Sequence, residues 1–241
     1  MGKREHEGKI SIVLPAYQEA ENLENILPSI NEVMKDYEYE ILIIDTMTPM
    51  DDTPSICEKN GATYINRSGG NTYGDAIRTG FSKATGKYVV IMDADGSHDP
   101  RDILRMREKM GNDEYDLIIG SRYIKGGNTE NPFILKAMSW ILNLTYRVMF
   151  GLKVKDVSDS YRMYHKALLN KLELSCSNFD IVEEILIKLS LMVKPFRVYE
   201  VPIFFDKRAA GKSKRDLVKF IFSYISTMKR LMTIKKNAKK L

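Results

Sequence analysis

The sequence predicts an α/β fold in which a mostly parallel sheet is covered by helices on both faces. Three observations support this prediction. Short segments that are apolar throughout recur along the first half of the chain, helical segments separate them, and polar or turn-forming residues end them. Uniformly apolar strands are typical of parallel sheets that are buried on both faces. Their alternation with helices favours parallel crossover connections.

The first half of the chain divides into strands and helices at clear boundaries. Pro15 ends the first apolar segment (KISIVL), Asp45 ends the second (YEILII) and Asp93 ends the fourth (KYVVIM), because proline and short polar residues favour turns. Gly69-Gly70 breaks the chain before one helix, and Asp99-Pro100 begins another. The predicted order is strand 9–14, helix 21–34, strand 39–44, helix 53–59, strand 62–66, helix 73–84, strand 87–92, helix 99–110 and strand 115–120.

The second half is less regular. It contains predicted helices at 132–150 and 179–192 and one or two strands within 196–205. No change of composition marks a second domain. We therefore expect one domain over residues 1–206, followed by a basic amphipathic segment over residues 207–241.

That C-terminal segment carries a large excess of positive charge. The chain has 37 Lys or Arg and 32 Asp or Glu among 241 residues, a net charge of +5. The segment alone carries +11, which leaves −6 for residues 1–206. Large apolar residues are interleaved with these charges, as in helices that lie at the surface of anionic membranes. We expect an anionic membrane surface as partner, and no nucleic acid because no binding module is present. A solvated terminal helix is the alternative.

The composition excludes several other classes of protein. With 44% hydrophobic and 29% charged residues, the chain can form a sizeable core and is neither disordered nor collagen-like. Cys57 and Cys176 stand far apart, which excludes a thiolate metal site and a disulfide framework and suits a reducing compartment. The uncharged apolar stretch 137–146 is too short to cross a membrane. The N-terminus lacks an apolar signal region, so we expect a soluble or peripheral protein.

Polar side chains stand where the predicted strands end. They are Tyr17, Glu19, Asp45, Asp93, Asp95 and Arg122. Ligands of parallel α/β sheets bind outside the carboxyl ends of the strands. We therefore expect these side chains to converge on one crevice.

The sharpest local feature is Asp93-Ala94-Asp95 at the end of a buried strand. Two carboxylates separated by one residue on a turn can face one Mg²⁺ or Mn²⁺ ion, which needs few protein ligands when diphosphate oxygens complete its shell. The alternative is a turn that caps the next helix. For the nearby His98 we favour a structural hydrogen bond over metal binding.

Five motifs occur in one order along residues 9–222. They are 15–19 (PAYQE), 93–95 (DAD), 120–123 (GSRY), 156–164 (DVSDSYRMY) and 208–214 (RAAGKSK). With these motifs the chain resembles family 2 glycosyltransferases of the GT-A fold. It is most similar to the polyprenyl-phosphate (dolichyl-phosphate) mannose and glucose synthases. The last two motifs favour lipid-phosphate acceptors.

The resemblance implies a GT-A Rossmann-like nucleotide-diphospho-sugar transferase fold. It implies an enzyme that moves a hexose with inversion from a UDP- or GDP-sugar to an isoprenoid lipid phosphate, with Mg²⁺ or Mn²⁺. Asp95 would bind the metal directly, and Asp93 would bind the metal or the ribose. The residues expected to bind the donor are Pro15, Ala16, Tyr17, Glu19, Asp45, Gly74, Asp75, Asp93, Ala94 and Asp95.

A lipid phosphate is largely ionised near neutral pH, so as a nucleophile it needs positioning by cations and no general base. Arg122, Arg162, Arg208 and Lys214 are the expected cations, with Ser139 and Ser213 as hydrogen-bond donors. The C-terminal segment would thus begin with an acceptor-binding loop. The residues expected to take part in catalysis are Asp93, Asp95, Arg122, Arg162, Glu184, Arg208 and Lys214.

Two alternatives to this function stay open. A saccharide hydroxyl as acceptor would require a general base, for which Glu183 and Glu184 are the candidates; Glu184 aligns with a glutamate of the lipid-phosphate synthases. A non-catalytic module that binds a nucleotide sugar or a membrane is the other alternative. The choice between uracil and guanine also stays open, because Thr46 replaces the second Asp of the family's Asp-Asp pair.

The helix predicted at 132–150 has two interpretations. Its large apolar residues either belong to the core or face the membrane and guide a polyprenyl tail. Family members without membrane spans bind the membrane peripherally or recruit a small membrane partner protein. We therefore expect a cytoplasmic enzyme that is peripheral on the cytoplasmic face of a membrane.

Overall fold

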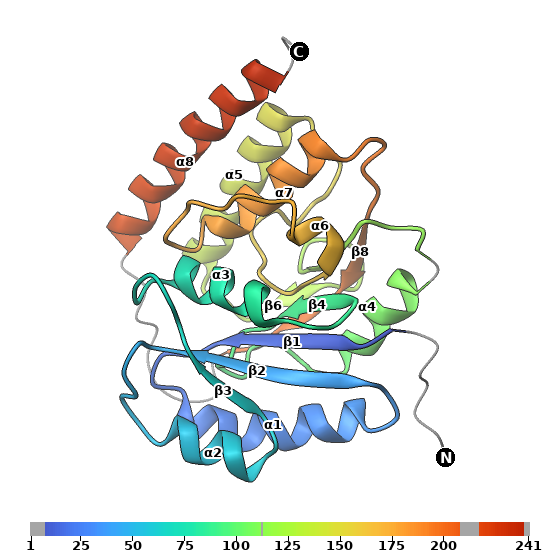
Figure 1. Ribbon diagram of the computed structural model, residues 1–241. Coiled ribbons are helices and arrows are strands. Elements are labelled where there is room, and N and C mark those ends of the chain that lie inside the picture. The colour runs from blue at the N-terminus through green and yellow to red at the C-terminus, as the bar shows by residue number, and fades with distance from the viewer. Residues whose placement is uncertain (1–7, 112, 208–216, 239–241) are drawn as a thin grey trace.

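A seven-stranded sheet forms the centre of the protein in the computed structural model (Figure 1), which describes residues 8–111, 113–207 and 217–238. Its strand order is β3-β2-β1-β4-β7-β5-β8. The strands of this sheet are β1 (Ile10–Pro15), β2 (Tyr39–Asp45), β3 (Thr63–Asn66), β4 (Tyr88–Ile91), β5 (Leu117–Ser121), β7 (Arg162–His165) and β8 (Val198–Pro202). Two short strands, β6 (Asn128–Thr129) and β9 (Phe204–Phe205), pair separately.

Helices cover both faces of this sheet. They are α1 (Ala20–Met34), α2 (Thr53–Lys59), α3 (Tyr73–Lys83), α4 (Asp102–Met110), α5 (Phe133–Phe150), α6 (Lys166–Leu169), α7 (Ile181–Met192) and α8 (Leu217–Ala238). In Figure 1, α1 and α2 lie on one side of the sheet, and α3, α5, α7 and α8 lie on the other. The predicted helices and strands are present, with ends that differ by up to three residues.

Each face of the sheet has its own hydrophobic core. Side chains alternate between the two faces along a strand, so Val13 of β1 packs with α3, α5, α7 and α8, while Ile12 and Leu14 pack with α1, α2 and α4. All these β1 side chains are fully buried. This explains why the strands are apolar throughout, and it confirms the α/β prediction.

Strand β7 was not predicted from the sequence. It lies between β4 and β5 and is antiparallel to both, whereas the other pairs of the main sheet are parallel. Arg162 and His165 interrupt its apolar pattern, so the sequence pattern does not predict a buried strand there. Its insertion places the end of the motif 156–164 inside the sheet and the loop before β7 beside the turn that follows β4, where Ser160 donates to Asp93.

Helix α8 packs against the body of the protein. Tyr224 and Leu231 are buried in the core that also contains parts of α5 and α7, and α8 lies beside those helices in Figure 1. These two apolar residues of the expected membrane-surface helix therefore pack into the protein core. Within the described residues, none of the helices combines the length and apolar character needed to cross a bilayer.

Candidate active site at the carboxyl edge of the sheet

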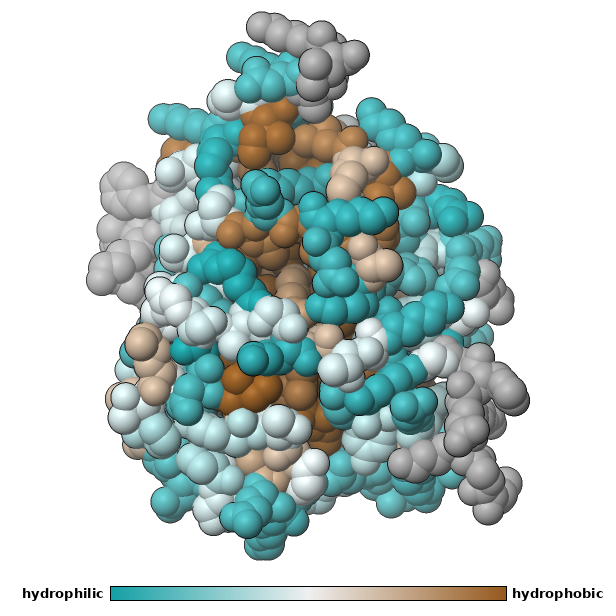
Figure 2. Space-filling model, in the orientation of Figure 1, coloured by the Kyte–Doolittle hydropathy of each residue, from teal (hydrophilic) through white to brown (hydrophobic). Residues whose placement is uncertain are grey.

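A cavity of about 1610 Å³ opens where the carboxyl ends of the strands meet α5, α7 and α8. Strand ends and the loops after them supply its polar lining, which includes Tyr17, Glu19, Arg67, Asp93, Asp95 and Arg122. The helices supply an apolar lining, which includes Leu135, Met138, Leu142, Val182, Tyr224 and Met228. In Figure 2, apolar surface gathers in the upper part of the molecule, where these helices lie. The cavity is larger than most single-ligand pockets and offers room for two substrates.

The turn after β4 holds two carboxylates at the cavity wall. Asp95 accepts hydrogen bonds from the amide of Ser97 at 3.1 Å and from its hydroxyl at 2.5 Å. Asp93 accepts one from the hydroxyl of Ser160 at 3.0 Å. Burial raises the pKa of Asp93, His98 opposes this shift, and the nearby carboxylates of Asp95 and Asp159 reinforce it. This concentration of negative charge would be relieved by a bound cation.

These carboxylates fit a metal that takes most of its ligands from a substrate. Within the described residues, no cluster of three or more His, Cys, Asp or Glu side chains is arranged to hold a metal ion. Asp93 and Asp95 could supply one or two ligands, and diphosphate oxygens and water could supply the others, as is common for Mg²⁺. The residues present therefore fit the metal that the sequence predicted.

His98 has a structural role, as expected. The amide of Asp93 donates to its Nδ1 at 3.1 Å, and its Nε2 lies 3.5 Å from Asp159 Oδ1. The ring stacks on Tyr161 with the centroids 4.5 Å apart. The accepted bond leaves Nδ1 without a lone pair for a metal, so His98 shapes the turn that carries the two carboxylates.

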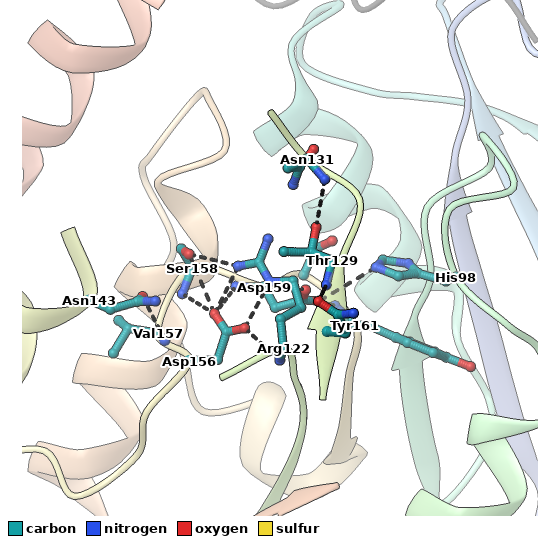
Figure 3. A network of polar contacts seen from close by, with 12 residues as sticks. His98, Arg122, Thr129, Asn131, Asn143, Asp156, Val157, Ser158, Asp159 and Tyr161 are labelled. Carbon is teal, nitrogen blue, oxygen red and sulfur yellow. Dashed lines mark hydrogen bonds and ion pairs between the residues drawn. The ribbon is translucent and has the colours of Figure 1, made fainter. Parts of the chain in front are cut away.

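Arg122 follows β5 and reaches into a buried group of polar side chains (Figure 3). Its Nε lies 2.8 Å from Asp156 Oδ2 and 3.0 Å from Asp159 Oδ2, and its Nη2 donates to Asp156 Oδ1 at 2.9 Å and to Ser158 at 2.9 Å. Burial alone would lower the pKa of Arg122, but the two aspartates raise it well above its usual range. Arg122 lines the cavity as predicted, although two carboxylates already offset its charge.

Arg162 and Glu184 do not line the cavity. Each instead joins elements that form its walls. The guanidinium of Arg162 is fully buried and donates to the carbonyls of Asp159 at 2.8 Å, Val157 at 2.5 Å and Val182 at 3.1 Å. It thus ties β7 to α7. This placement differs from the phosphate contact expected from the sequence, because the guanidinium already bonds main-chain carbonyls.

Glu184 is also fully buried. It accepts hydrogen bonds from the amides of Ser175 and Cys176 and pairs with Lys188 at 2.9 Å and Arg230 at 3.2 Å. Burial would raise its pKa, but these bonds lower it to about 2. Glu184 therefore joins α7 to α8 and to the loop before α7, and in this geometry it touches the site only through them.

The predicted donor residues divide into two groups. Those from the turns after β1 and β4 line the cavity: Pro15, Ala16, Tyr17, Glu19, Asp93, Ala94 and Asp95. Asp45, Gly74 and Asp75 lie behind that wall and support it. Ser139 lines the cavity, whereas Arg208, Ser213 and Lys214 lie outside the described residues.

Each of the three supporting residues has a structural partner. Asp45 accepts from the hydroxyl of Tyr64 at 3.1 Å, and burial raises its pKa. Asp75 completes the capping box of α3 with Thr72. A Cβ on Gly74 would lie 2.1 Å from the carbonyl oxygen of Cys176, so this glycine allows the loop before α7 to approach α3.

Arg67 is the main cavity residue that the sequence analysis missed. It directly follows β3, so the rule that identified Asp93 and Arg122, namely a polar residue after a strand, would also have identified it.

Replacement of Glu183 by glutamine is expected to stabilise the protein at high pH. Burial raises the pKa of Glu183 to about 8, although Arg162 nearby opposes the shift. Between its ordinary value of 4.5 and about 8, the folded chain holds a proton that the unfolded chain has lost, so the free energy of unfolding falls as pH rises. Urea unfolding at pH 5 and pH 8 should show a smaller fall for Glu183→Gln than for the native chain. The exposed Glu58→Gln is the control; equal slopes in all three proteins would contradict the assignment.

Comparison with known proteins agrees with this geometry. The model of the family described as Glycosyl transferase family 2 matches residues 11–173. A dolichol-phosphate mannosyltransferase of Pyrococcus furiosus is 35% identical over 231 residues, which are 93% of this chain and 64% of that protein. The chain thus spans somewhat less than two thirds of that relative. A polyprenol monophosphomannose synthase of Mycolicibacterium smegmatis is 29% identical over 219 residues, which are 84% of this chain and 79% of that protein.

Solved structures show the same fold. Glucosyl-3-phosphoglycerate synthase of Mycobacterium tuberculosis, in complex with Mn²⁺, uridine diphosphate and glucosyl-3-phosphoglycerate, superimposes with a TM-score of 0.74. The match covers 93% of this chain and 80% of that one at 18% identity. At this identity the likeness concerns the fold alone.

Proposed function

The chain belongs to glycosyl transferase family 2, and we propose that it transfers a hexose from a UDP- or GDP-sugar to the phosphate of an isoprenoid lipid. The family, the GT-A fold and the glycosyltransferase class agree with the sequence predictions. One observation supports the proposed substrates above all others. A single cavity combines the two carboxylates after β4 with an apolar lining from α5, α7 and α8.

The polar lining suits the donor. Asp93 and Asp95 would hold Mg²⁺ or Mn²⁺, and such an ion would supply charge neutralisation for the leaving group. The loop after β1, from Pro15 to Glu19, lies at the same wall, where the nucleotide of an α/β protein commonly binds.

The apolar lining suits the acceptor lipid, and the reaction needs no general base. An oxygen of the ionised phosphate attacks the anomeric carbon, the bond from that carbon to the nucleoside diphosphate breaks, and the configuration inverts. Glu183 and Glu184, the candidate bases for a hydroxyl acceptor, are fully buried and do not line the cavity, so this geometry does not favour the alternative. Arg208 and Lys214 remain our candidates for positioning the phosphate.

A transfer panel tests this function directly. Radiolabelled UDP-glucose, UDP-galactose, UDP-GlcNAc and GDP-mannose would each be offered with a short polyprenyl phosphate and Mn²⁺. The names of the relatives lead us to expect label from a mannose donor in an acid-labile lipid. Donor binding or slow donor hydrolysis with no labelled lipid would overturn the proposed acceptor.

We also propose that the outer face of α5 lies against the cytoplasmic face of a membrane. Phe133, Trp140, Leu144 and Val148 stand on one side of the helix at helical spacing and are exposed, Phe133 by 84% and Val148 by 74%. Other residues of α5 line the apolar part of the cavity. A lipid tail could therefore pass from the bilayer to the site along this helix. A contiguous exposed apolar surface is typical of sites that bind a protein partner or a membrane.

Trp140 is the single tryptophan of the chain, so its fluorescence reports directly on this surface. We expect a blue shift on addition of vesicles that contain anionic phosphatidylglycerol. The triple variant Phe133→Ser, Leu144→Ser, Val148→Ser should bind these vesicles at least about tenfold more weakly, because each buried side chain contributes roughly 1.5–3 kcal/mol. The control Met50→Ser, Met192→Ser removes exposed apolar groups elsewhere. An unchanged spectrum with vesicles would favour a small membrane partner protein instead.

A further inference from the structure

Arg67 makes an unusual set of contacts at the wall of the cavity. The backbone of Arg67 continues the pairing of β3 with β2, and its side chain crosses the carboxyl ends of β2 and β1. Only 5% of the residue is exposed. The guanidinium donates to main-chain carbonyls alone: Asp45 at 3.0 Å, Asn71 at 3.1 Å, Thr72 at 3.0 Å, Ile44 at 3.3 Å and Ala16.

These five bonds use the full donor capacity of one arginine. They also join three separate segments: the end of β1 at Ala16, the end of β2, and the turn that begins α3. Two of these segments supply cavity residues, namely the loop after β1 and the turn at Asn71 and Thr72. A single side chain thus fixes the relative positions of loops that are far apart in the sequence.

Among the described residues, the charge of Arg67 has no direct counter-ion. In the part of the chain that the structure describes, no carboxylate oxygen forms an ion pair with its guanidinium, although Asp45 and Asp75 favour the charged form from a longer distance. Burial lowers the pKa of Arg67. A buried cation is costly when it is unpaired, and this one borders a cavity that has room for an anionic ligand.

We propose that Arg67 is a positioning residue for the donor: it braces three segments, two of which line the nucleotide wall, and its fixed charge attracts the nucleoside diphosphate. This proposal rests on the proposed function, because it assumes that the donor is a nucleotide sugar. The guanidinium needs no contact with the ligand. Its hydrogen bonds are already formed before the donor arrives, and the charge is therefore held in place without reorganisation.

Binding of UDP and GDP in the presence of Mn²⁺, measured by titration calorimetry, tests the proposal. Arg67→Met keeps the aliphatic stem and loses the charge and all five bonds, so we expect about 100-fold weaker binding. Arg67→Lys keeps the charge but offers at most three donors, so we expect about tenfold weaker binding. Both variants should raise the KM for the donor more than they lower kcat.

Arg107→Met is the matched control, since Arg107 is also a buried arginine but lies on α4, away from the cavity lining. It should bind the nucleotide within twofold of the native chain. Nucleotide binding by Arg67→Met within twofold of the native value would overturn the proposal. If Arg67→Met does not fold, the same result with Arg67→Lys would overturn the bracing role. A native chain that binds neither nucleotide would overturn the proposed function, and this inference with it.

Discussion

Replacement of Asp95 by alanine is expected to lower the rate of sugar transfer by at least about a thousandfold, because it removes a charge at the proposed metal and donor site. Asp95 is half-buried at the cavity wall, on the turn that Gly96 forms with a φ of 82°. Asp95 accepts hydrogen bonds from the amide and the hydroxyl of Ser97, which lies on the same turn. The fold should therefore tolerate the change, and the loss should be one of activity.

Initial rates with saturating donor and a titration of Mn²⁺ would measure this effect. Asp99→Ala is the matched control, because Asp99 belongs to the same loop but lies outside the cavity lining and pairs with Arg101. We expect it to retain most of the activity. An Asp95→Ala enzyme with undiminished metal-dependent transfer would remove Asp95 from the assigned metal site.

The residues of the site that could be predicted are those whose position follows from local sequence. Asp93, Asp95, Tyr17 and Glu19 each come shortly after an apolar strand, and parallel strands bring such positions to one edge of the sheet. The cavity indeed collects all four. A short-range pattern and one rule of topology were sufficient for them.

Burial and pairing partners could not be predicted in the same way. Arg162 and Glu184 are charged residues that suggest chemistry, but some of their contacts come from other elements, such as Val182 for Arg162 and Arg230 for Glu184. The sequence shows that a charged residue is present. It does not show which carbonyl or carboxylate that residue will contact in the folded chain. Both residues stabilise the walls of the site, and this role becomes visible only once β7, α7 and α8 are in place.

The surface against which the apolar face of α8 packs could not be predicted from the sequence either. An apolar helix face packs equally well against lipid or against a protein core, and periodicity does not distinguish the two. In the structure Tyr224 and Leu231 join the core. The exposed apolar stripe lies instead on α5, whose sequence alone left both interpretations open.

The largest loss of stability is expected from Asp156→Ala, which should lower the free energy of unfolding by about 3–5 kcal/mol. Asp156 is fully buried and binds Arg122 through both carboxylate oxygens, at 2.8 and 2.9 Å. It also accepts a hydrogen bond from the amide of Arg122 at 3.0 Å. Its removal leaves a buried guanidinium with Asp159 as the remaining carboxylate partner, and the cost of that poorly compensated charge dominates the effect.

Urea unfolding of a double-mutant cycle separates this charge effect from lost packing. Arg122→Met in the Asp156→Ala background removes the cation as well, so the double variant should be more stable than the sum of the two single losses implies. Glu32→Ala breaks an exposed pair with Lys35 and should change the free energy of unfolding far less. Strictly additive losses would show that the two residues contribute independently. A positive coupling would instead show that the motif 156–164 holds the Arg122 side of the cavity through this buried pair.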